Sequence, residues 1–581
     1  MRVNIKKMAK KEIQKDLKKA IKKTLGVELK EIHLEHPENS EHGDYSSNFA
    51  MTNFKKQSAS WRKKAKSPFE LAKKIVSNFP KTNYLKKIEP VSPGFVNFYL
   101  SNKFLGLQIN QVLKEKNNFG AKNLGKNKKA IVEFGQPNTH KLPHVGHFRS
   151  YAIGESIARL FEFTGYNVFR ANYQGDVGLQ VAKCLWAYLK KKIKQKKDLK
   201  ENIKDLQKAY AFGSKMYSEN ETAKKEIDIL NIKIYNQDKN IFNLWEKTRK
   251  WSLDYYALMN KRLNTKYHRQ YFESEAAKEG KKIVLENLNK VFKKSKGAIV
   301  FPGEKYGLHT RVFITSNGNP AYEAKDLALM LLKKKDFDYD ISLVSTASEQ
   351  SEYFKVVYKA AEFIYPKLAK KFIHIPFGMI SLTGAKLSSR KGSIVSIDEL
   401  LEKTKESLVL LMKQKKYSQK QINEIVDVLT IGAAKYSILK NKPIKDMIFN
   451  IKESVALQGN SGPYLQYTHA RAQSILRKSK IKKIKKINGT SLNNEKETML
   501  LRMFIKFPEI IENAAKNYSP NLICNFLFEL AQNFNNFYES LPVLKARDKE
   551  LKNTRLGLVK ATAQIIKNGL YLLGIQAPEK M

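Results

Sequence analysis

Residues 130–173 read AIVEFGQPNTHKLPHVGHFRSYAIGESIARLFEFTGYNVFRANY, and this stretch decides the fold. The apolar run at 130–135 predicts a short buried strand, and the apolar residues after the following loop share one helical face. These residues are Phe148, Ile153, Ile157, Leu160 and Phe161. Gly165 predicts the end of the helix, and 167–173 predicts a second strand. Strand, loop, helix and strand form a βαβ unit, which builds a parallel sheet whose ligands bind at the carboxyl ends of the strands.

The chain has 581 residues, more than one hydrophobic core supports, so several domains are expected. Residues 1–115 predict a small α+β domain, in which a basic amphipathic helix precedes the strand-like IEPVSPGFVNFYLS at 88–101. Residues 126–400 predict a Rossmann-like, parallel-sheet domain with a helical insertion at about 182–296. Residues 401–581 predict an all-α bundle. The expected fold class is therefore multidomain α/β.

The composition favours a polyanionic partner. Lysine and arginine number 107 against 55 acidic residues, and the net charge of +52 suits nucleic acid. A lysine-rich genome would also scatter lysines over the whole chain, and this alternative stays open. Two distant cysteines, Cys184 and Cys524, exclude a disulfide framework and a multi-thiolate zinc site, and they fit a reducing cytoplasm. No segment approaches the ~20 uninterrupted apolar residues of a membrane span.

The loop HVGH at 144–147 lies between the predicted strand and the predicted helix. Backbone N–H groups at a helix N-terminus attract anions, and Gly146 lets a phosphate or a nucleobase come close. His144 and His147 can donate hydrogen bonds to phosphate oxygens. A metal site would need further converging ligands, and Glu133 is the only acidic residue in the adjacent strand. We therefore expect an anion site without a metal.

A second basic loop lies within GMISLTGAKLSSRKGSIVSIDELLEK at 378–403. The helix after it is expected to begin at a capping box formed by Ser396 and Glu399. A basic loop flanked by glycines suits a mobile clamp on polyphosphate, and a solvated turn is the alternative in so lysine-rich a chain. The polar residues of this loop are Lys386, Ser388, Ser389, Arg390 and Lys391.

The pair HVGH and KLSSR resembles the HIGH and KMSKS signatures of class I aminoacyl-tRNA synthetases. The surrounding text resembles the arginyl-tRNA synthetases in particular, over the whole block from 132 to 180 and in NPAYEAKDLALM at 319–330. GNSGPYLQYTHARAQSILRK at 459–478 and the final LLGIQAPEKM are also similar to landmarks of that family. The helical insertion is the least distinctive part.

The resemblance implies a reaction in which ATP and arginine form arginyl-adenylate and pyrophosphate, and the arginyl group then passes to the 3′ end of tRNA(Arg). Positioning and charge neutralisation carry both steps. His144 and His147 would stabilise the reacting α-phosphate, and Lys386 would hold the other two phosphates. The residues implied in ATP binding are His144, Gly146, His147, Met379, Lys386 and Ser388. Those implied in arginine binding are Glu133, Asn138, Tyr322, Asp326 and Gln350.

One departure from the family pattern affects catalysis. The KMSKS pattern has a second lysine where this chain has Ser389, so a cation expected near the α-phosphate is missing from the loop. Arg390 and Lys391 are candidates to replace it. We favour Lys141, because it lies on the connection between strand and helix, where a charge is held more firmly than on a mobile loop. Family members with the same gap use a lysine at this place.

RNA contacts are also implied by the resemblance. PGFVNFYL is similar to the part of the N-terminal domain that reads the outer corner of the tRNA, so Phe95 and Asn97 are expected to stack on and hydrogen-bond a base. Burial within a strand is the alternative for both residues. Tyr464 and Tyr467 in GPYLQY are expected to stack on anticodon bases.

The expected partners are tRNA(Arg), L-arginine and ATP accompanied by Mg²⁺, with no protein-bound zinc, no membrane, a monomeric state and a cytoplasmic location. Three alternatives remain at this point. A nucleotidylyltransferase also uses an HxGH pair, but such enzymes are usually shorter. A synthetase for another amino acid fits the two signatures alone, whereas AYEAKD and YLQYTHAR favour arginine. An RNA-binding relative without catalysis would be expected to have lost several of the residues named above.

Overall fold

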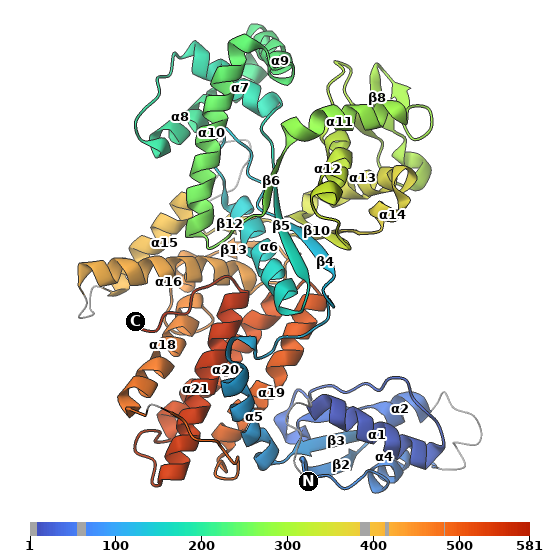
Figure 1. The fold of residues 1–581 in the computed structure, drawn as a ribbon, viewed down its shortest axis with the longest axis vertical. Helices are drawn as coiled ribbons and strands as arrows, with labels where there is room; N and C mark the ends of the chain where they lie inside the picture. The colour runs from blue at the N-terminus through green and yellow to red at the C-terminus, as the bar shows by residue number, and fades with distance from the viewer. Residues whose placement is uncertain (1–8, 55–64, 384–394, 413–417, 482) are drawn as a thin grey trace.

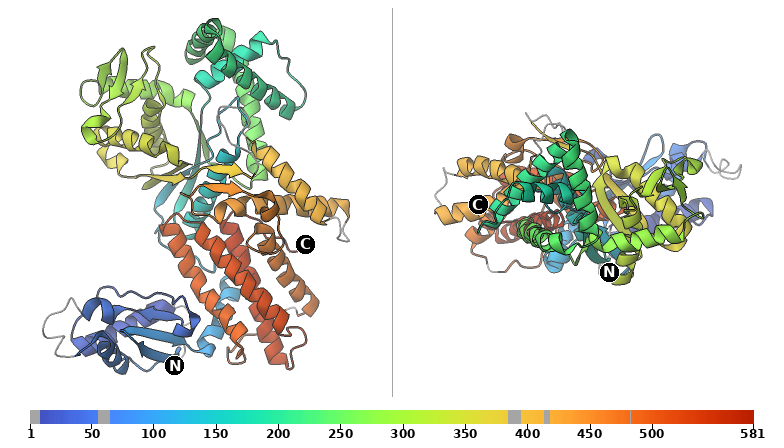
Figure 2. Two further views of the ribbon diagram at one scale, coloured as in Figure 1. Left: turned by 180° about the vertical axis from the view of Figure 1, so that it is seen from behind. Right: turned by 90° about the horizontal axis from the view of Figure 1, so that it is seen from above.

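The computed structural model describes residues 9–54, 65–383, 395–412, 418–481 and 483–581. The molecule is elongated: a small N-terminal unit lies at one end, a bundle of C-terminal helices follows, and a sheet with two lobes forms the other end (Figures 1 and 2).

The N-terminal unit is the expected α+β domain. Its antiparallel sheet has the order β1-β3-β2 and is covered by helices. In α1 the buried residues Ile13, Leu17 and Ile21 recur at helical spacing, as the sequence predicts. The elements are α1 (Ala9–Leu25), β1 (Tyr45–Ser47), α2 (Phe49–Phe54), α4 (Pro68–Ser77), β2 (Leu85–Val91) and β3 (Phe95–Leu100), with a 3₁₀ turn at Ser40–His42.

The central sheet is parallel and has the order β11-β10-β4-β5-β6. Its strands are β4 (Lys129–Glu133), β5 (Asn167–Gln174), β6 (Arg269–Phe272), β10 (Ile341–Ala347) and β11 (Phe372–Phe377). The first strand, β4, lies between β5 and β10, so the connections reverse direction beside β4. In such sheets the ligand binds at this reversal, beyond the carboxyl ends of the strands. Helix α6 (Val145–Phe163) leaves from that point.

Two sequence signals for the boundaries of helices are confirmed, one at the end of α6 and one at the start of α15. The chain leaves α6 through Gly165, which has φ +85°. Helix α15 (Ile397–Met412) begins at the expected capping box, in which the Glu399 backbone N–H donates to Ser396 Oγ (3.2 Å) and the Ser396 backbone N–H donates to the Glu399 carboxylate (2.8 Å).

Two lobes interrupt the sheet (Figure 1). The first contains α7 (Leu179–Lys190), α8 (Leu199–Glu219), α9 (Glu221–Tyr235) and α10 (Lys239–Arg262). The second contains α11 (Glu273–Glu286), β7 (Lys293–Ser295), β8 (Ala298–Phe301), β9 (Arg311–Ile314), α12 (Tyr322–Asp336), α13 (Ser351–Ile364) and α14 (Pro366–Ala369), with 3₁₀ turns at Gly303–Tyr306 and Ser348–Gln350.

The structure differs from the expected insertion in one respect. Strand β6 falls inside 182–296, yet it pairs with β5 and forms the edge of the central sheet. It has four residues and begins with Arg269 and Gln270, so no apolar run marks it in the sequence. Strands β8 and β9 pair with β7 in a separate antiparallel sheet.

The C-terminal part described by the structure is a helical bundle, as expected, and α5 (Asn102–Glu115) packs against it. Its elements are α16 (Gln419–Leu439), α17 (Ile451–Ser454), α18 (Gly462–Ser479), α19 (Glu495–Lys516), α20 (Asn521–Ser540) and α21 (Lys549–Leu572). A 3₁₀ turn at Lys116–Asn118 follows α5. Two short parallel strands, β12 (Ile380–Leu382) and β13 (Met447–Phe449), join this part to the end of the central sheet.

Candidate functional site

The two histidines of HVGH form the first turn of α6. The backbone N–H of Gly146 donates to Nδ1 of His144 (3.1 Å), and the backbone N–H of His144 donates to Nδ1 of His147 (3.1 Å). The two rings lie 3.9 Å apart between centroids and are tilted by 45°. Each side chain is therefore fixed by the main chain at the helix N-terminus, where backbone N–H groups attract anions.

The protonation of these rings follows from their surroundings. Burial and the charge of Lys141 lower the pKa of His144 to about 4, and burial with the neighbouring charges holds the pKa of His147 well below its usual value. Both rings are neutral near pH 7. A backbone N–H can only donate, so each Nδ1 is an acceptor and the single ring proton is on Nε2. The pair thus presents two Nε2–H donors.

The second basic loop is attached beside this pair. The structure does not describe Lys386, Ser388, Ser389, Arg390 and Lys391, so the roles expected of them rest on the sequence alone. After the loop, the Val145 N–H donates to the Val395 carbonyl (3.1 Å) and the Ile397 N–H donates to the Pro143 carbonyl (3.0 Å). The segment that follows the second signature is therefore joined by backbone hydrogen bonds to the segment that carries the first.

Met379 lies just before the loop and is 47% exposed. Its carbonyl accepts a hydrogen bond (2.7 Å) from the Nη1 of Arg149, a buried residue of α6. The structure thus brings Met379, which the sequence places in the ATP site, to the helix that begins with HVGH.

Lys141 is half-buried, and its Nζ lies 5.3 Å from the centroid of the Tyr210 ring on α8. Its charge is close enough to lower the pKa of both His144 and His147. The charge of Lys141 therefore lies near the two histidines.

Three carboxylates gather near the carboxyl ends of the strands. Asp326, half-buried on α12, accepts a hydrogen bond from the Tyr353 hydroxyl (2.6 Å). Burial first, and then the charges of Glu133 and Glu273, raise the pKa of Asp326 to about 7. In the part of the chain that the structure describes, no lysine or arginine forms an ion pair with Asp326.

The other two carboxylates already have cationic partners. Glu133, at the end of β4, forms an ion pair with Lys333 of α12 and accepts a hydrogen bond from Gln136 Nε2 (3.0 Å). Glu273, at the end of β6, forms an ion pair with Lys325. These four charged side chains are at most 5% exposed. Such burial requires a partner, which explains why Glu133 is paired within the protein although the sequence assigns it to a ligand.

The remaining expected pocket residues differ in position. Asn138 Oδ1 accepts the Gly175 N–H (3.2 Å), and a Cβ on Gly175 would lie 2.6 Å from this oxygen and 2.8 Å from Glu273 Oε1. Asn138 and Glu273 therefore meet beyond β5. Tyr322 is 51% exposed at the start of α12, and the Lys325 ammonium lies 4.7 Å from its ring centroid. Gln350 is exposed immediately before α13, and among the described residues no hydrogen bond joins it to the other four.

Glu273 is the main site residue that the sequence analysis missed. Parallel strands place the residue after their last position at the ligand edge, so a carboxylate immediately after a strand is a candidate. That signal depends on recognising β6, and the short polar sequence RQYF hides it.

The residues expected to contact RNA lie in two places. Phe95 is half-buried, whereas Asn97 is only 3% exposed and its Oδ1 accepts a hydrogen bond from Ser46 Oγ (2.7 Å). Asn97 thus takes the buried-strand alternative in this structure, and base contact would require its surroundings to move. Tyr464 and Tyr467 are half-buried on α18.

These two tyrosines belong to a polar cluster between α18 and α20. Asn535 Nδ2 donates to the Tyr464 hydroxyl (2.9 Å), and Arg471 Nη2 donates to the Tyr467 hydroxyl (3.2 Å). The Arg471 guanidinium also lies 4.8 Å from the Tyr467 ring centroid, and its Nη1 donates to Asn535 Oδ1 (2.9 Å). A half-exposed aromatic surface beside a guanidinium is suited to stacking on unpaired bases.

The described residues contain no group of three histidine, cysteine, aspartate or glutamate side chains that could hold a metal ion. None of their helices is long and apolar enough to cross a membrane.

Comparison with protein families divides the chain into three. Residues 11–100 match the arginyl tRNA synthetase N terminal domain, 108–451 match the catalytic domain of tRNA synthetases class I (R), and 465–581 match the DALR anticodon binding domain.

Curated relatives match over nearly their whole length. The arginine–tRNA ligase of Borreliella burgdorferi is 34% identical over 535 residues, which cover 89% of this chain and 91% of the relative. That of Alkaliphilus metalliredigens is 31% identical over 557 residues, which cover 94% and 95%.

Solved structures share the fold. The arginyl-tRNA synthetase of Thermus thermophilus matches with a TM-score of 0.82 at 24% identity and covers 99% of this chain and 100% of its own. That of Plasmodium falciparum matches with a TM-score of 0.80 at 24% identity, with coverage of 98% and 99%.

Proposed function

This chain belongs to the arginyl-tRNA synthetase family, and from that premise we propose which of its residues carry out the reaction. The chain is a class I ligase: it activates arginine with ATP to arginyl-adenylate and transfers the arginyl group to tRNA(Arg), with release of pyrophosphate and AMP. Both steps are displacements, in which the protein positions the reacting groups and neutralises developing charge.

His144 and His147 donate their Nε2–H groups to the α-phosphate of ATP. Two neutral donors, held by backbone hydrogen bonds before the substrate arrives, favour the transition state without reorganisation. Gly146 leaves room for the nucleotide, and Met379 contacts it. Lys386 and Ser388 bind the phosphates from the loop whose far end is bonded to Pro143 and Val145.

Lys141 supplies the cation that Ser389 does not. The proposal is supported by its contribution to the lowered pKa of both histidines, which are the proposed donors to the α-phosphate. Its main-chain carbonyl accepts a hydrogen bond from the Tyr256 hydroxyl (2.9 Å), so the backbone that carries it is fixed.

The environment of Asp326 is the main support for an arginine pocket. It is a half-buried carboxylate with a raised pKa, a hydrogen bond from a neutral tyrosine and, among the described residues, no ion pair with a lysine or arginine. The charge of Lys333, which is paired with Glu133, offsets the raised pKa only in part. A guanidinium is planar, always charged and matched to a carboxylate, so arginine supplies what Asp326 lacks. Glu273 and Glu133 add negative potential, and Asn138, Tyr322 and Gln350 orient the substrate.

The tRNA lies along the molecule from the N-terminal unit to the central sheet. We assign Phe95 and Asn97 to its outer corner and Tyr464 and Tyr467 to its anticodon. Mg²⁺ enters with ATP, and no protein-bound zinc takes part. The protein acts as a cytoplasmic monomer. The division at 1–115, 126–400 and 401–581 is retained as our assignment of domains, with β6 added to the catalytic sheet.

The assay that tests this function is ATP–pyrophosphate exchange with each amino acid, with and without tRNA. The family generally needs bound tRNA to activate arginine, so we expect exchange only when arginine and tRNA(Arg) are both present. Exchange driven by another amino acid, or no exchange with arginine and tRNA together, would overturn the assignment.

A further inference from the structure

Helix α10 of the inserted lobe holds the segment that leads to HVGH. The Tyr256 hydroxyl donates to the carbonyls of Asn138 (2.6 Å) and Lys141 (2.9 Å). Between these residues His140 is buried in a left-handed conformation (φ +63°). Its N–H donates to Ser252 Oγ (3.0 Å), and its Nε2 lies 2.8 Å from Thr248 Oγ1. His140 therefore fixes this segment against α10.

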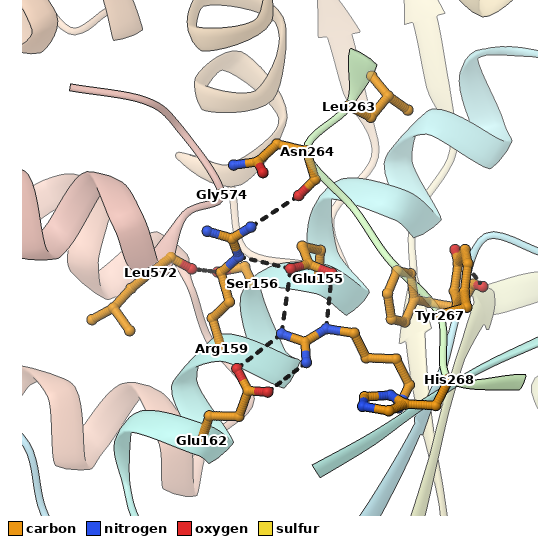
Figure 3. A network of polar contacts seen from close by, with 12 residues as sticks. Glu155, Ser156, Arg159, Glu162, Leu263, Asn264, Tyr267, His268, Leu572 and Gly574 are labelled. Carbon is orange, nitrogen blue, oxygen red and sulfur yellow. Dashed lines mark hydrogen bonds and ion pairs between the residues drawn. The ribbon is translucent and has the colours of Figure 1, made fainter. Parts of the chain in front are cut away.

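The C-terminal end of α10 is held by two basic side chains. Lys435 of α16 donates from Nζ to the carbonyls of Leu263 (2.6 Å) and Gly574 (3.0 Å). Arg159 of α6 donates to the carbonyls of Asn264 (2.9 Å) and Tyr571 (3.0 Å). Each of the two side chains thus bridges the end of α10 to the end of α21, and Figure 3 shows Arg159 between the two chain segments.

The chemistry of these bridges is that of helix ends. Tyr571 lies in the last turn of α21 and Leu263 is the C-cap of α10, whereas Asn264 and Gly574 follow the two helices. Carbonyls at a helix end lack partners within the helix and carry partial negative charge, so the N–H groups of basic side chains bind there favourably. Lys435 is 0% exposed, and the Arg159 side chain is 9% exposed. Glu155 pairs with both Arg159 and Arg170, and Arg170 pairs in turn with Glu162 (Figure 3). A buried network whose donors are satisfied specifies one arrangement of its elements.

We propose that Lys435 and Arg159 are positioning residues for adenylate formation. They connect the C-terminal bundle to the end of α10, and α10 holds Asn138 and Lys141. The docking of the bundle therefore determines where these two residues lie. Tyr256 and Leu263 are seven residues apart on one helix, about 10 Å along its axis. A displacement at the α21 end is therefore carried to the segment before HVGH. The inference rests on the proposed roles of Asn138, Lys141 and His144.

A matched control separates this role from domain docking in general. Ser156 of α6 donates to the Leu572 carbonyl (2.8 Å), so it joins α21 to the helix of Arg159 by a bond that does not include α10. Lys435→Met removes the bridge to α10. Ser156→Ala removes a bond between α6 and α21 in which α10 takes no part.

The experiment measures ATP–pyrophosphate exchange that depends on arginine and tRNA, together with the tRNA Kd and the melting temperature of each protein. The proteins compared are the wild type, Lys435→Met, Ser156→Ala, Tyr256→Phe and the double variant Lys435→Met/Tyr256→Phe. We expect Lys435→Met to lower kcat about tenfold, since small misplacements of a reacting group are costly. Its tRNA Kd should change less than about twofold, and Ser156→Ala should match wild type within about twofold in both. The double variant should lose no more than the worse single variant, because both act through α10.

The proposal is overturned if folded Lys435→Met keeps wild-type kcat, if Ser156→Ala loses as much as Lys435→Met, or if the losses of the two single variants multiply in the double variant. Should Lys435→Met not fold, Arg159→Lys replaces it, because a lysine keeps the charge but its single Nζ cannot take the places of Arg159 Nε, Nη1 and Nη2, which contact Glu155, Tyr571 and Asn264. Wild-type kcat in that variant overturns the proposal equally. Absence of arginine-dependent exchange in the wild type instead overturns the proposed function.

Discussion

The backbone N–H of His144 donates to Nδ1 of His147 across 3.1 Å, so the first histidine of the HVGH pair orients the second through the main chain. Gly146 does the same for His144. These two bonds determine which ring nitrogen carries the proton, and they turn a pair of histidines into a pair of fixed donors.

Replacing His144 tests the donor role. His144→Ala should lower kcat of exchange by about 10²–10³, the usual cost of one transition-state donor. His144→Gln should lose less, because its amide N–H can take the place of the ring Nε2–H. Steady-state exchange with saturating ATP measures both, and equal losses in the two variants would contradict the donor assignment.

The pH profile gives a second test of the same rings. Since burial lowers the pKa of His144 to about 4, the ring stays neutral as pH falls through 6.5 and becomes protonated only near 4. We expect no inflection of kcat near pH 6.5 that depends on His144. Such an inflection, if it disappears in His144→Gln, would show that the ring titrates normally.

Lys141→Ala should reduce adenylate formation strongly and leave arginine KM nearly unchanged, because the charge acts on the phosphate and not on the amino acid. Lys391→Ala is the matched comparison, since it removes the rival cation of the second loop. Single-turnover formation of arginyl-adenylate measures both variants. If Lys391→Ala abolishes the step and Lys141→Ala leaves it intact, the replacement cation is Lys391.

Asp326 predicts a pH dependence of arginine binding. Only the carboxylate form pairs with a guanidinium, and its pKa is raised to about 7, so a proton competes with arginine below that pH. Arginine KM should therefore rise as pH falls from 7.5 to 6, by up to about tenfold per pH unit, while ATP KM stays level. Asp326→Asn should raise arginine KM at every pH and remove the dependence. A flat profile in the wild type would exclude Asp326 as the guanidinium partner.

The sequence predicted the βαβ unit, the parallel sheet, the three-part organisation and the family, because each depends on long patterns or local signals such as Gly165 and the Ser396–Glu399 capping box. It missed what depends on tertiary pairing. Strand β6 is defined by its contact with β5, and Glu273 enters the site only through that strand.

Buried partners were missed for the same reason. Nothing in the sequence near Lys333 shows that it faces Glu133, since the two residues meet only when α12 packs beside β4. Likewise the role of His140 depends on Thr248 and Ser252, more than a hundred residues away. Periodicity reports which face of an element is buried, and it does not report which polar groups meet there.

Variants of the Glu133–Lys333 pair test whether Glu133 contributes to the stability of the protein, to arginine binding or to both. Lys333→Met leaves a carboxylate buried without its cation and should destabilise the protein by about 3–5 kcal/mol. Adding Glu133→Leu removes the orphaned charge, so the double variant should regain most of that stability, as is common when a buried pair is replaced by apolar side chains. Urea unfolding measures both. If Glu133 also contributes to the arginine pocket, the refolded double variant keeps a raised arginine KM despite its recovered stability. Recovery of both quantities would make Glu133 a structural residue only and leave Asp326 and Glu273 as the acidic groups of the pocket.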